Sequence, residues 1–288
     1  MIRRALFVTL LVLALPHGAG AQGVPTDEGG HLNYAFATQL GGGIYRVGGQ
    51  TIQIYRLTGS VNLRQRENLG LSLKAPVTFG FYNFALEDIV DGALPQSLGT
   101  LAVVPTLELA IPAKDNWVLV PFGGLGGGGD FSGGAFNWIY AAGVRSLASF
   151  QPGTTTLRLG NRFVYTGYTD NNLQFTDDFT FLETGLDARR GLGIRLGDRT
   201  VDGSVFGTNY LYLTSPHLIS NVNDFRSTIV EWEFGVTLGT VEDWRLLGLL
   251  LPRLGVSYRF GPEFDGIRVI IGNPFRLDSP RDEGSSFQ

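Results

Sequence analysis

The 288-residue chain contains no cysteine, only three histidines and no run of basic residues. Without cysteine it cannot form disulfide bonds, a cysteine-ligated metal site or the lipidated cysteine of a lipoprotein. The formal net charge is −4, so we expect no nucleic-acid partner. No apolar segment reaches the roughly 20 residues that a membrane-spanning helix needs. These absences exclude a disulfide-stapled domain and a helical membrane protein.

The N-terminus carries the features of an export signal. Arg3 and Arg4 precede an apolar run from Ala5 to Leu15, and Ala19-Gly20-Ala21 is a small-x-small cleavage site. The apolar run is too short to span a membrane as a helix. The sequence therefore predicts a secretory signal peptide over residues 1–21.

The composition favours strands. The chain has 41 glycines, 20 phenylalanines, 10 tyrosines and 4 tryptophans. The glycine share is roughly twice the average of about 7%. Helical proteins are instead biased toward Ala, Leu, Glu and Lys, so we expect an all-β protein.

Alternation of apolar with polar or small residues is the main structural signal, because successive side chains of a strand point to opposite faces. In the clearest case Val230, Trp232 and Phe234 alternate with Glu231 and Glu233. Similar rows occupy residues 69–74, 106–111, 136–140, 157–160, 192–196, 230–238 and 255–260.

Several of these runs reach about 10 residues, the length of a tilted membrane strand, whereas strands of soluble proteins have a mode of about 5–6. Lipid contains no water to satisfy a free strand edge, so such a sheet must close on itself. We predict a closed antiparallel transmembrane β-barrel of about 12 strands, within a range of 10–14. A secreted soluble β-protein is the alternative.

The connections fit this architecture. We expect compact turns at Pro152-Gly153, Gly197-Asp198 and Asp202-Gly203, and longer polar loops at 168–178 and 214–225. The predicted organisation is a signal peptide (1–21), an N-terminal segment that is a plug or a first strand (22–48), the barrel (49–275) and a polar tail (276–288). Leu254–Phe260 and Ile267–Ile271 are expected to be the last two strands.

If the apolar rows face lipid, the alternate rows face the lumen. Burying unpaired charge is costly, so these groups should pair with one another or contact water. We expect them to brace the wall; a conduit lined by arginines at 158, 162 and 195 is the alternative. The lumen-facing candidates are Lys74, Glu108, Arg158, Arg162, Arg195, Glu231, Glu233 and Arg259.

Catalytic chemistry has weak support. His217 and Ser220 provide a base and a nucleophile for an outer-membrane lipid hydrolase. Their separation of three, however, places the two side chains on opposite faces of a strand. We therefore expect no enzyme and name no catalytic residue.

Ligand motifs are equally weak. The glycine run Gly124–Gly129 matches the G-x-G-x-x-G pattern of nucleotide-binding loops. That pattern needs a strand, a turn and a helix, whereas the flanks here are strand-like. We expect these glycines to bend a strand or to accept aromatic rings. Asp170, Asp177 and Asp178 lack a calcium-loop spacing. We expect no cofactor and no metal.

Three stretches resemble a known family: "GGGIYRVGGQTIQIYRL" (41–57), "PFGGLGGGG…FNWIYAAGVRS" (121–146) and the closing "YRFGPEFDGIRVIIGNPF". They are similar to the solitary autotransporter-like outer-membrane β-barrels. The resemblance covers nearly the whole mature chain and implies a translocator-like barrel of about 12 strands. It brings no catalytic residues.

The sequence thus predicts an integral outer-membrane β-barrel of a Gram-negative-type bacterium with a structural or narrow-pore role, autotransporter-like but without a passenger. A small-solute porin and a lipid hydrolase using His217 and Ser220 are the alternatives. We expect contact with outer-membrane lipid, lipopolysaccharide and the barrel-assembly machinery; no feature identifies a soluble partner.

Overall fold

The computed structural model describes residues 34–47, 50–66, 69–82, 99–130, 136–170, 175–197, 199–214, 230–241, 244–246, 249–251, 253–262, 264–272 and 274. The predicted signal peptide, His217, Ser220 and the polar tail 276–288 lie outside these residues. No helix among them is both long and apolar enough to cross a membrane.

The described residues form one short helix, α1 (Tyr34–Gln39), and fifteen strands. The strands are β1 (Gly43–Val47), β2 (Gln50–Arg66), β3 (Leu69–Tyr82), β4 (Thr100–Val103), β5 (Thr106–Lys114), β6 (Trp117–Asp130), β7 (Asn137–Phe150), β8 (Thr155–Asp170), β9 (Phe175–Leu196), β10 (Arg199–Thr214), β11 (Val230–Thr240), β12 (Trp244–Leu246), β13 (Leu249–Leu251), β14 (Leu254–Gly261) and β15 (Phe264–Ile271).

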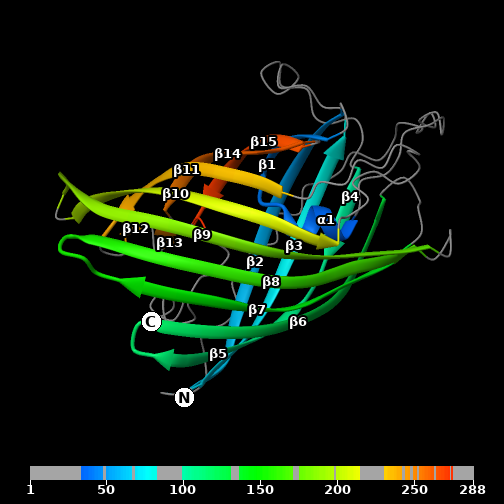
Figure 1. Ribbon diagram of the computed structural model, residues 1–288, viewed down its shortest axis with the longest axis horizontal. Coiled ribbons are helices and arrows are strands. Elements are labelled where there is room, and N and C mark those ends of the chain that lie inside the picture. The colour runs from blue at the N-terminus through cyan, green and yellow to red at the C-terminus, as the bar shows by residue number, and fades with distance from the viewer. Residues whose placement is uncertain are drawn as a thin grey trace.

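The main sheet closes on itself. Each wall strand pairs antiparallel with its neighbours, and β1 pairs with both β2 and β15, which joins the two ends of the sheet. β4 and β5 share one position in the wall, since both pair with β3 and β6. Twelve positions result, which confirms the predicted all-β antiparallel barrel (Figure 1). The first wall strand begins at Gly43, within the segment 22–48 that the sequence assigns to a plug or a first strand.

The division between β4 and β5 has a local cause. Pro105 lies between the two strands, and proline has no N–H to donate to a ladder. The backbone is held across the break by two other bonds: Val104 N–H donates to Pro76 O at 3.4 Å, and Leu125 N–H donates to Pro105 O at 3.2 Å.

The two ends of the barrel differ. At one end, here the turn end, two to four residues connect β2 to β3, β5 to β6, β7 to β8, and β9 to β10. At the opposite end, here the loop end, residues 83–99 separate β3 from β4, and residues 215–229 separate β10 from β11. Gly153 and Gly197 adopt φ of 63° and 65° at the predicted turns. The turn predicted at Asp202-Gly203 is wrong, because both residues lie inside β10 and pair with β9 and β11.

Alternation separates the two faces of the wall as the sequence predicts. On β11, Glu231 and Glu233 are fully buried, whereas Trp232 and Phe234 are 45% and 53% exposed on the outside. The same division recurs around the ring, so the outer face of the barrel is largely apolar and the inner face holds the charges. The outer face of a barrel in water would instead be mainly polar.

The glycine run lies within β6, with no helix after it in the described chain. A Cβ on Gly126 would approach the carbonyl oxygen of Val103 and lie 2.6 Å from the Cα of Val104, where the neighbouring wall strand is divided. The ring of Phe136 packs on Gly127. These two contacts support the interpretation that the run allows close backbone and aromatic approach.

We predict that Gly126→Ala destabilises the barrel by about 1–3 kcal/mol, because the added methyl group collides with backbone that cannot rotate away. Gly123→Ala is the matched control, since a Cβ there meets nothing within 4 Å. Urea unfolding of the detergent-solubilised barrel, followed by tryptophan fluorescence, measures the difference. Equal unfolding midpoints for the two variants would contradict the assigned contact.

Candidate functional site: the barrel lumen

Helix α1 lies inside the ring of strands, nearer the loop end (Figure 1). It contacts β3, β4, β7 and β8, and its side chains from Tyr34 to Thr38 are buried. Six residues are too few for a stable isolated helix, so packing inside the barrel must hold it.

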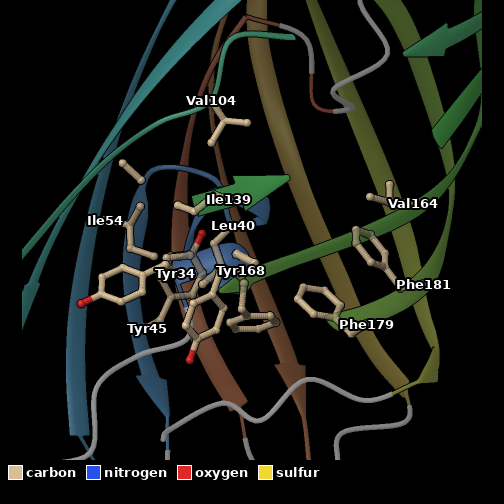
Figure 2. Packing of buried hydrophobic residues seen from close by; sticks show 14 of the residues in the cluster. Tyr34, Leu40, Tyr45, Ile54, Val104, Ile139, Val164, Tyr168, Phe179 and Phe181 are labelled. Carbon is tan, nitrogen blue, oxygen red and sulfur yellow. The ribbon is translucent and has the colours of Figure 1, made fainter. Parts of the chain in front are cut away.

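Aromatic rings join α1 to the wall on several sides. The ring of Phe36 lies 6.1 Å from Phe179, 6.4 Å from Tyr212 and 5.9 Å from Phe264, which belong to β9, β10 and β15. Tyr34 packs edge-on against Tyr168 of β8, with centroids 5.6 Å apart. Figure 2 shows Tyr34, Leu40, Tyr168 and Phe179 among the side chains gathered between the strands of the wall.

Barrel geometry explains why one helix fits here. A spacing of about 4.8 Å between strands tilted by about 40° gives a 12-stranded ring a backbone diameter of roughly 24 Å. Eight strands leave room for side chains alone, while 16–18 leave an aqueous channel. A helix with its side chains is about 10–12 Å wide. Wall side chains and one helix therefore fill the cross-section at the level of Phe36.

The C-terminal end of α1 is held by cations from the wall. Arg56 of β2 donates to the carbonyl oxygen of Thr38, and Arg162 of β8 donates to the side-chain oxygen of Gln39 at 3.0 Å. Carbonyl groups at a helix C-terminus lack partners within the helix, and arginine satisfies them. The helix is thus fixed from opposite parts of the ring.

Glycines connect α1 to the first wall strand, β1. A Cβ on Gly41 would overlap the side chain of Arg268, and one on Gly43 would lie 2.8 Å from the Cα of the same residue. Tyr45 reaches back and donates its hydroxyl to Gly41 O at 2.9 Å. Any larger residue at these positions would displace Arg268.

Two buried carboxylates of β11 begin a ladder of ion pairs below the aromatic rings. Arg259 of β14 donates to Glu231 at 2.6 Å and 2.5 Å, and its guanidinium stacks 3.6 Å from the centre of the Tyr210 ring. Arg268 of β15 donates to Glu233 at 3.0 Å and 3.1 Å. Each carboxylate therefore has a cation on the neighbouring part of the wall.

Hydroxyl groups complete the shell of Glu233. Tyr210 donates to it at 2.6 Å and Ser257 at 2.5 Å. Hydrogen bonds to an ionised carboxylate are shorter and stronger than those between neutral groups. Glu233 therefore accepts four hydrogen bonds from three side chains on β10, β14 and β15, and it links these three strands.

Ion pairs continue on the other side of the lumen and toward the turn end. Arg162 pairs with Glu183 at 2.7 Å, and Glu108 pairs with Arg145 and with Lys74, the latter at 3.4 Å. Nearer the turn end, Arg253 pairs with Asp202, and Arg189 lies 3.7 Å from Asp187 and 3.9 Å from Asp202.

Seven of the eight sequence-predicted lumen residues point inward. Six of them take part in the ion pairs above: Lys74, Glu108, Arg162, Glu231, Glu233 and Arg259. Arg158 lies on the same face of β8 as Arg162, and it is opposite Asp187 of β9. Arg195 is exposed instead. It lies where β9 extends beyond its last pair with β8, Thr155 with Arg190, and both faces of that extension are exposed. Arg158, Arg162 and Arg195 therefore do not line one path.

Sequence reasoning missed α1 and about half of the inward charges: Arg56, Arg145, Glu183, Asp187, Arg189, Asp202, Arg253 and Arg268. For some a signal was present. Glu183, Asp187 and Arg189 have the same parity in β9, and Leu182 and Leu186 the opposite one. Arg253 precedes β14 and has no strand parity that could have placed it inside.

The charged side chains described in the lumen pair mainly with one another. In the described part of the chain no cluster of three or more His, Cys, Asp or Glu residues is suited to a metal. Asp178 is exposed at the start of β9 and accepts from Tyr165 at 3.2 Å. His217 and Ser220 lie outside the described residues. No family model and no curated protein matches the sequence.

We predict that Arg259→Met costs about 3–5 kcal/mol of stability, because Glu231 stays buried without its cation. The double variant Arg259→Met/Glu231→Leu should recover most of this loss, since it removes both charges. Arg190→Met, at an exposed position of β9, should change stability by less than about 0.5 kcal/mol. Urea unfolding of these proteins and of the single variant Glu231→Leu gives the coupling, and additive losses would show that the pair is not energetically linked.

Proposed function

We propose that the protein is an integral outer-membrane β-barrel of a Gram-negative-type bacterium, and that helix α1 keeps its lumen closed. Its role is structural, and it is neither an open general pore nor an enzyme. The single observation that carries the closed lumen is the contact of Phe36 with rings on β9, β10 and β15, at the level where α1 also contacts β3, β4, β7 and β8.

The outer face supports the membrane setting. A closed ring leaves no row of unsatisfied backbone groups toward lipid, and an apolar exterior with a charged interior suits a bilayer. Aromatic pairs gather on the outside toward the loop end: Phe136 with Trp138 at 5.2 Å, Tyr140 with Tyr165 at 5.9 Å, Trp232 with Phe234 at 6.2 Å and Tyr258 with Phe260 at 5.7 Å. Such rings favour the membrane–water interface.

The connections support an orientation. Barrels of this kind have short periplasmic turns and longer extracellular loops. We therefore assign the turn end to the periplasm and the loop end to the cell surface, in contact with lipopolysaccharide. The predicted signal peptide would deliver the chain to the barrel-assembly machinery.

The autotransporter-like character remains part of this proposal. The observations that favour it are a 12-position ring and a helix that runs inside the lumen before the first wall strand. The porin alternative predicts an open lumen and is decided by the conductance measurement below. No described residue favours the lipid hydrolase.

We predict that Val236→Arg lowers the fraction of folded barrel in lipid vesicles, because Val236 lies at the middle of β11 and a cation on the lipid face costs about 2–4 kcal/mol at the membrane midplane. Val236→Ile keeps an apolar side chain at the same exposed position and should fold as the native chain does. The heat-dependent shift of the band in a detergent gel measures the folded fraction. Normal folding of Val236→Arg in vesicles would place this face outside the hydrocarbon.

We predict that removal of α1 opens the lumen. Three chains that all end at Phe275 are compared in planar bilayers: residues 22–275, 34–275 and 42–275. The first two retain α1 and should stay closed, while the third should give discrete, steady conductance steps. Ending each chain at the same residue prevents the polar tail from affecting the comparison.

Two results would contradict the closing role of α1. Conductance of the 22–275 and 42–275 chains in equal steps would show that the helix does not obstruct the lumen, and would favour the porin. A folded but silent 42–275 chain would show that another element obstructs it. The heat-dependent band shift establishes that each chain is folded.

A further inference from the structure

Strand β2 continues past the strand that closes the ring. β1 pairs only with residues 50–54 of β2, since its first residue, Gly43, faces Ile54. β2 runs on beside β3 as far as Arg66, and the two strands can be followed together in Figure 1. Among the described strands, only β3 pairs with residues 57–66. The ring is closed at the level of β1, and beyond it this part of β2 is a strand edge at the turn end.

The edge exists because the chain before β1 enters the lumen. A strand that extended β1 backward would lie beside residues 57–66 of β2, but Leu40 is instead packed inside the ring with α1. Gly42 still belongs to the wall, because its carbonyl oxygen accepts from Val269 N–H of β15 at 3.0 Å. β15 itself ends at Ile271. β2 therefore projects toward the turn end beyond both of the strands that close the ring.

The backbone groups of every second residue point out of this edge. In an antiparallel pair, residues that exchange hydrogen bonds with the partner strand alternate with residues that point away from it. Thr58 faces Pro76 of β3, whose carbonyl oxygen accepts from Val104 N–H on the opposite side of β3. Thr58 and Pro76 are therefore a pair of the second kind. By the same alternation, Thr58, Ser60 and Asn62 direct their N–H and C=O groups away from β3.

The side chains along the edge are open on both faces of the strand. In the outward row, Leu57 is 67% exposed and Val61 is 60% exposed. In the inward row, Thr58 and Asn62 are exposed as well, whereas Ser72, which faces Asn62 from β3, is 2% exposed. A row of open backbone donors and acceptors with uncovered side chains is a template for a further strand.

We propose that residues 57–62 of β2 bind an extended segment of another protein, which adds a strand to the wall in line with β1. Such a segment would run antiparallel to β2, as every described neighbour in the wall does. Main-chain hydrogen bonds supply the affinity in this mode, and alternate side chains supply the specificity. Apolar residues of the segment would lie beside Leu57 and Val61, and polar residues beside the inward row.

Charge adds a second requirement on the partner. Arg64 and Arg66 follow the edge and are exposed, and their register opposite Leu71 and Leu69 places them on the outward face. These two cations outnumber Glu67 in the hairpin sequence. Opposite charges on neighbouring strands are favourable, so the segment should carry carboxylates where it enters beside the arginines, at its N-terminal end.

A second copy of this chain does not fit the edge. Antiparallel pairing of two β2 edges needs a twofold axis perpendicular to the sheet, which would place the turn ends of the two barrels on opposite sides of the membrane. Parallel pairing would continue the apolar face of one wall into the polar face of the other. With the proposed orientation the turn end lies in the periplasm, so the partner is a periplasmic polypeptide. The inference rests on that orientation for the compartment alone, and the closing role of α1 does not enter it.

Binding of a synthetic peptide to the 22–288 barrel in detergent tests the proposal. The peptide has about eight residues in which threonine alternates with valine, preceded by two aspartates, and it carries a fluorescent label. Its anisotropy should show saturable binding. The same peptide with prolines in place of two threonines lacks the pairing N–H groups, so it controls for uptake by the detergent and should bind about tenfold more weakly or less.

Proline in the edge tests the backbone contact. Ser60→Pro removes an N–H that points away from β3, and its ring obstructs the incoming strand, so the peptide should bind about tenfold more weakly. Ser60→Ala keeps the N–H and should bind as the native barrel does. Thr58→Pro and Thr58→Ala form a second matched pair if Ser60→Pro does not fold, which the heat-dependent band shift establishes. Equal binding to the proline and alanine variants would overturn the proposal.

The charge contacts are tested separately. Arg64→Gln together with Arg66→Gln should weaken binding of the acidic peptide about two- to tenfold at low salt, and should not affect a peptide with asparagines in place of the aspartates. Arg190→Gln, at an exposed position of β9, should leave both affinities unchanged. Equal affinity of the acidic peptide for the double variant and the native barrel would overturn the assigned charge chemistry.

A shorter chain distinguishes the competing occupant, a terminal segment of this protein. Binding of the peptide to the 34–275 chain but not to the 22–288 chain would assign the edge to such a segment. Absence of binding to both folded chains would show that the edge accepts no strand. Either result would overturn the proposal and leave the conductance test of α1 unaffected.

Discussion

The fold depends on the pairing of β1 with both β2 and β15. These five residues of β1 join the first and last parts of the chain, and without them the sheet would have two free edges. Closure also fixes the register all the way round, and a slip of one residue in any wall strand would exchange its inner and outer side chains. For β11 such a slip would carry Glu231 and Glu233 to the apolar exterior and Trp232 into the ion pairs. The charged interior and the apolar exterior are therefore two consequences of one constraint.

Charged side chains of the interior pair across strands, and this pairing offsets the cost of burying them. Glu231 with Arg259 joins β11 to β14, Glu233 with Arg268 joins β11 to β15, and Arg162 with Glu183 joins β8 to β9. Ion pairs of this kind are weak evidence for stability, because a well-packed apolar pair is often equally stable. Their value here is positional. A carboxylate inside the ring has few cations within reach, so each pair favours a single register. Arg162 also donates to α1, as does Arg56 of β2.

The sequence shows which side chains of a strand share a face. It does not show which residues of neighbouring strands they contact. Alternation predicted an all-β ring of about 12 strands and assigned Glu108, Glu231 and Arg259 to the inner face. It placed Arg195 there as well, because parity along one strand does not reveal that β9 extends beyond β8. Asp202 and Gly203 are residue types that favour a turn, yet both lie inside β10. There Asp202 forms an ion pair with Arg253, and this contact outweighs the preference of the two residues for a turn. Helix α1 has no periodic signal in six residues, since the lumen stabilises it and its own sequence does not.

The two halves of the lumen differ in what a solute would meet. Near the loop end the cross-section is filled by aromatic rings around Phe36. Near the turn end the inner wall carries Arg189 and Arg253 with their partners Asp187 and Asp202. At the junction of β15 with β1, Gly41 lies against the side chain of Arg268, and the carbonyl oxygen of Pro274 accepts a hydrogen bond from it. Arg268 also pairs with Glu233 of β11. One cation therefore links the residue that follows α1, the end of the last wall strand and β11, beside the position where the ring closes.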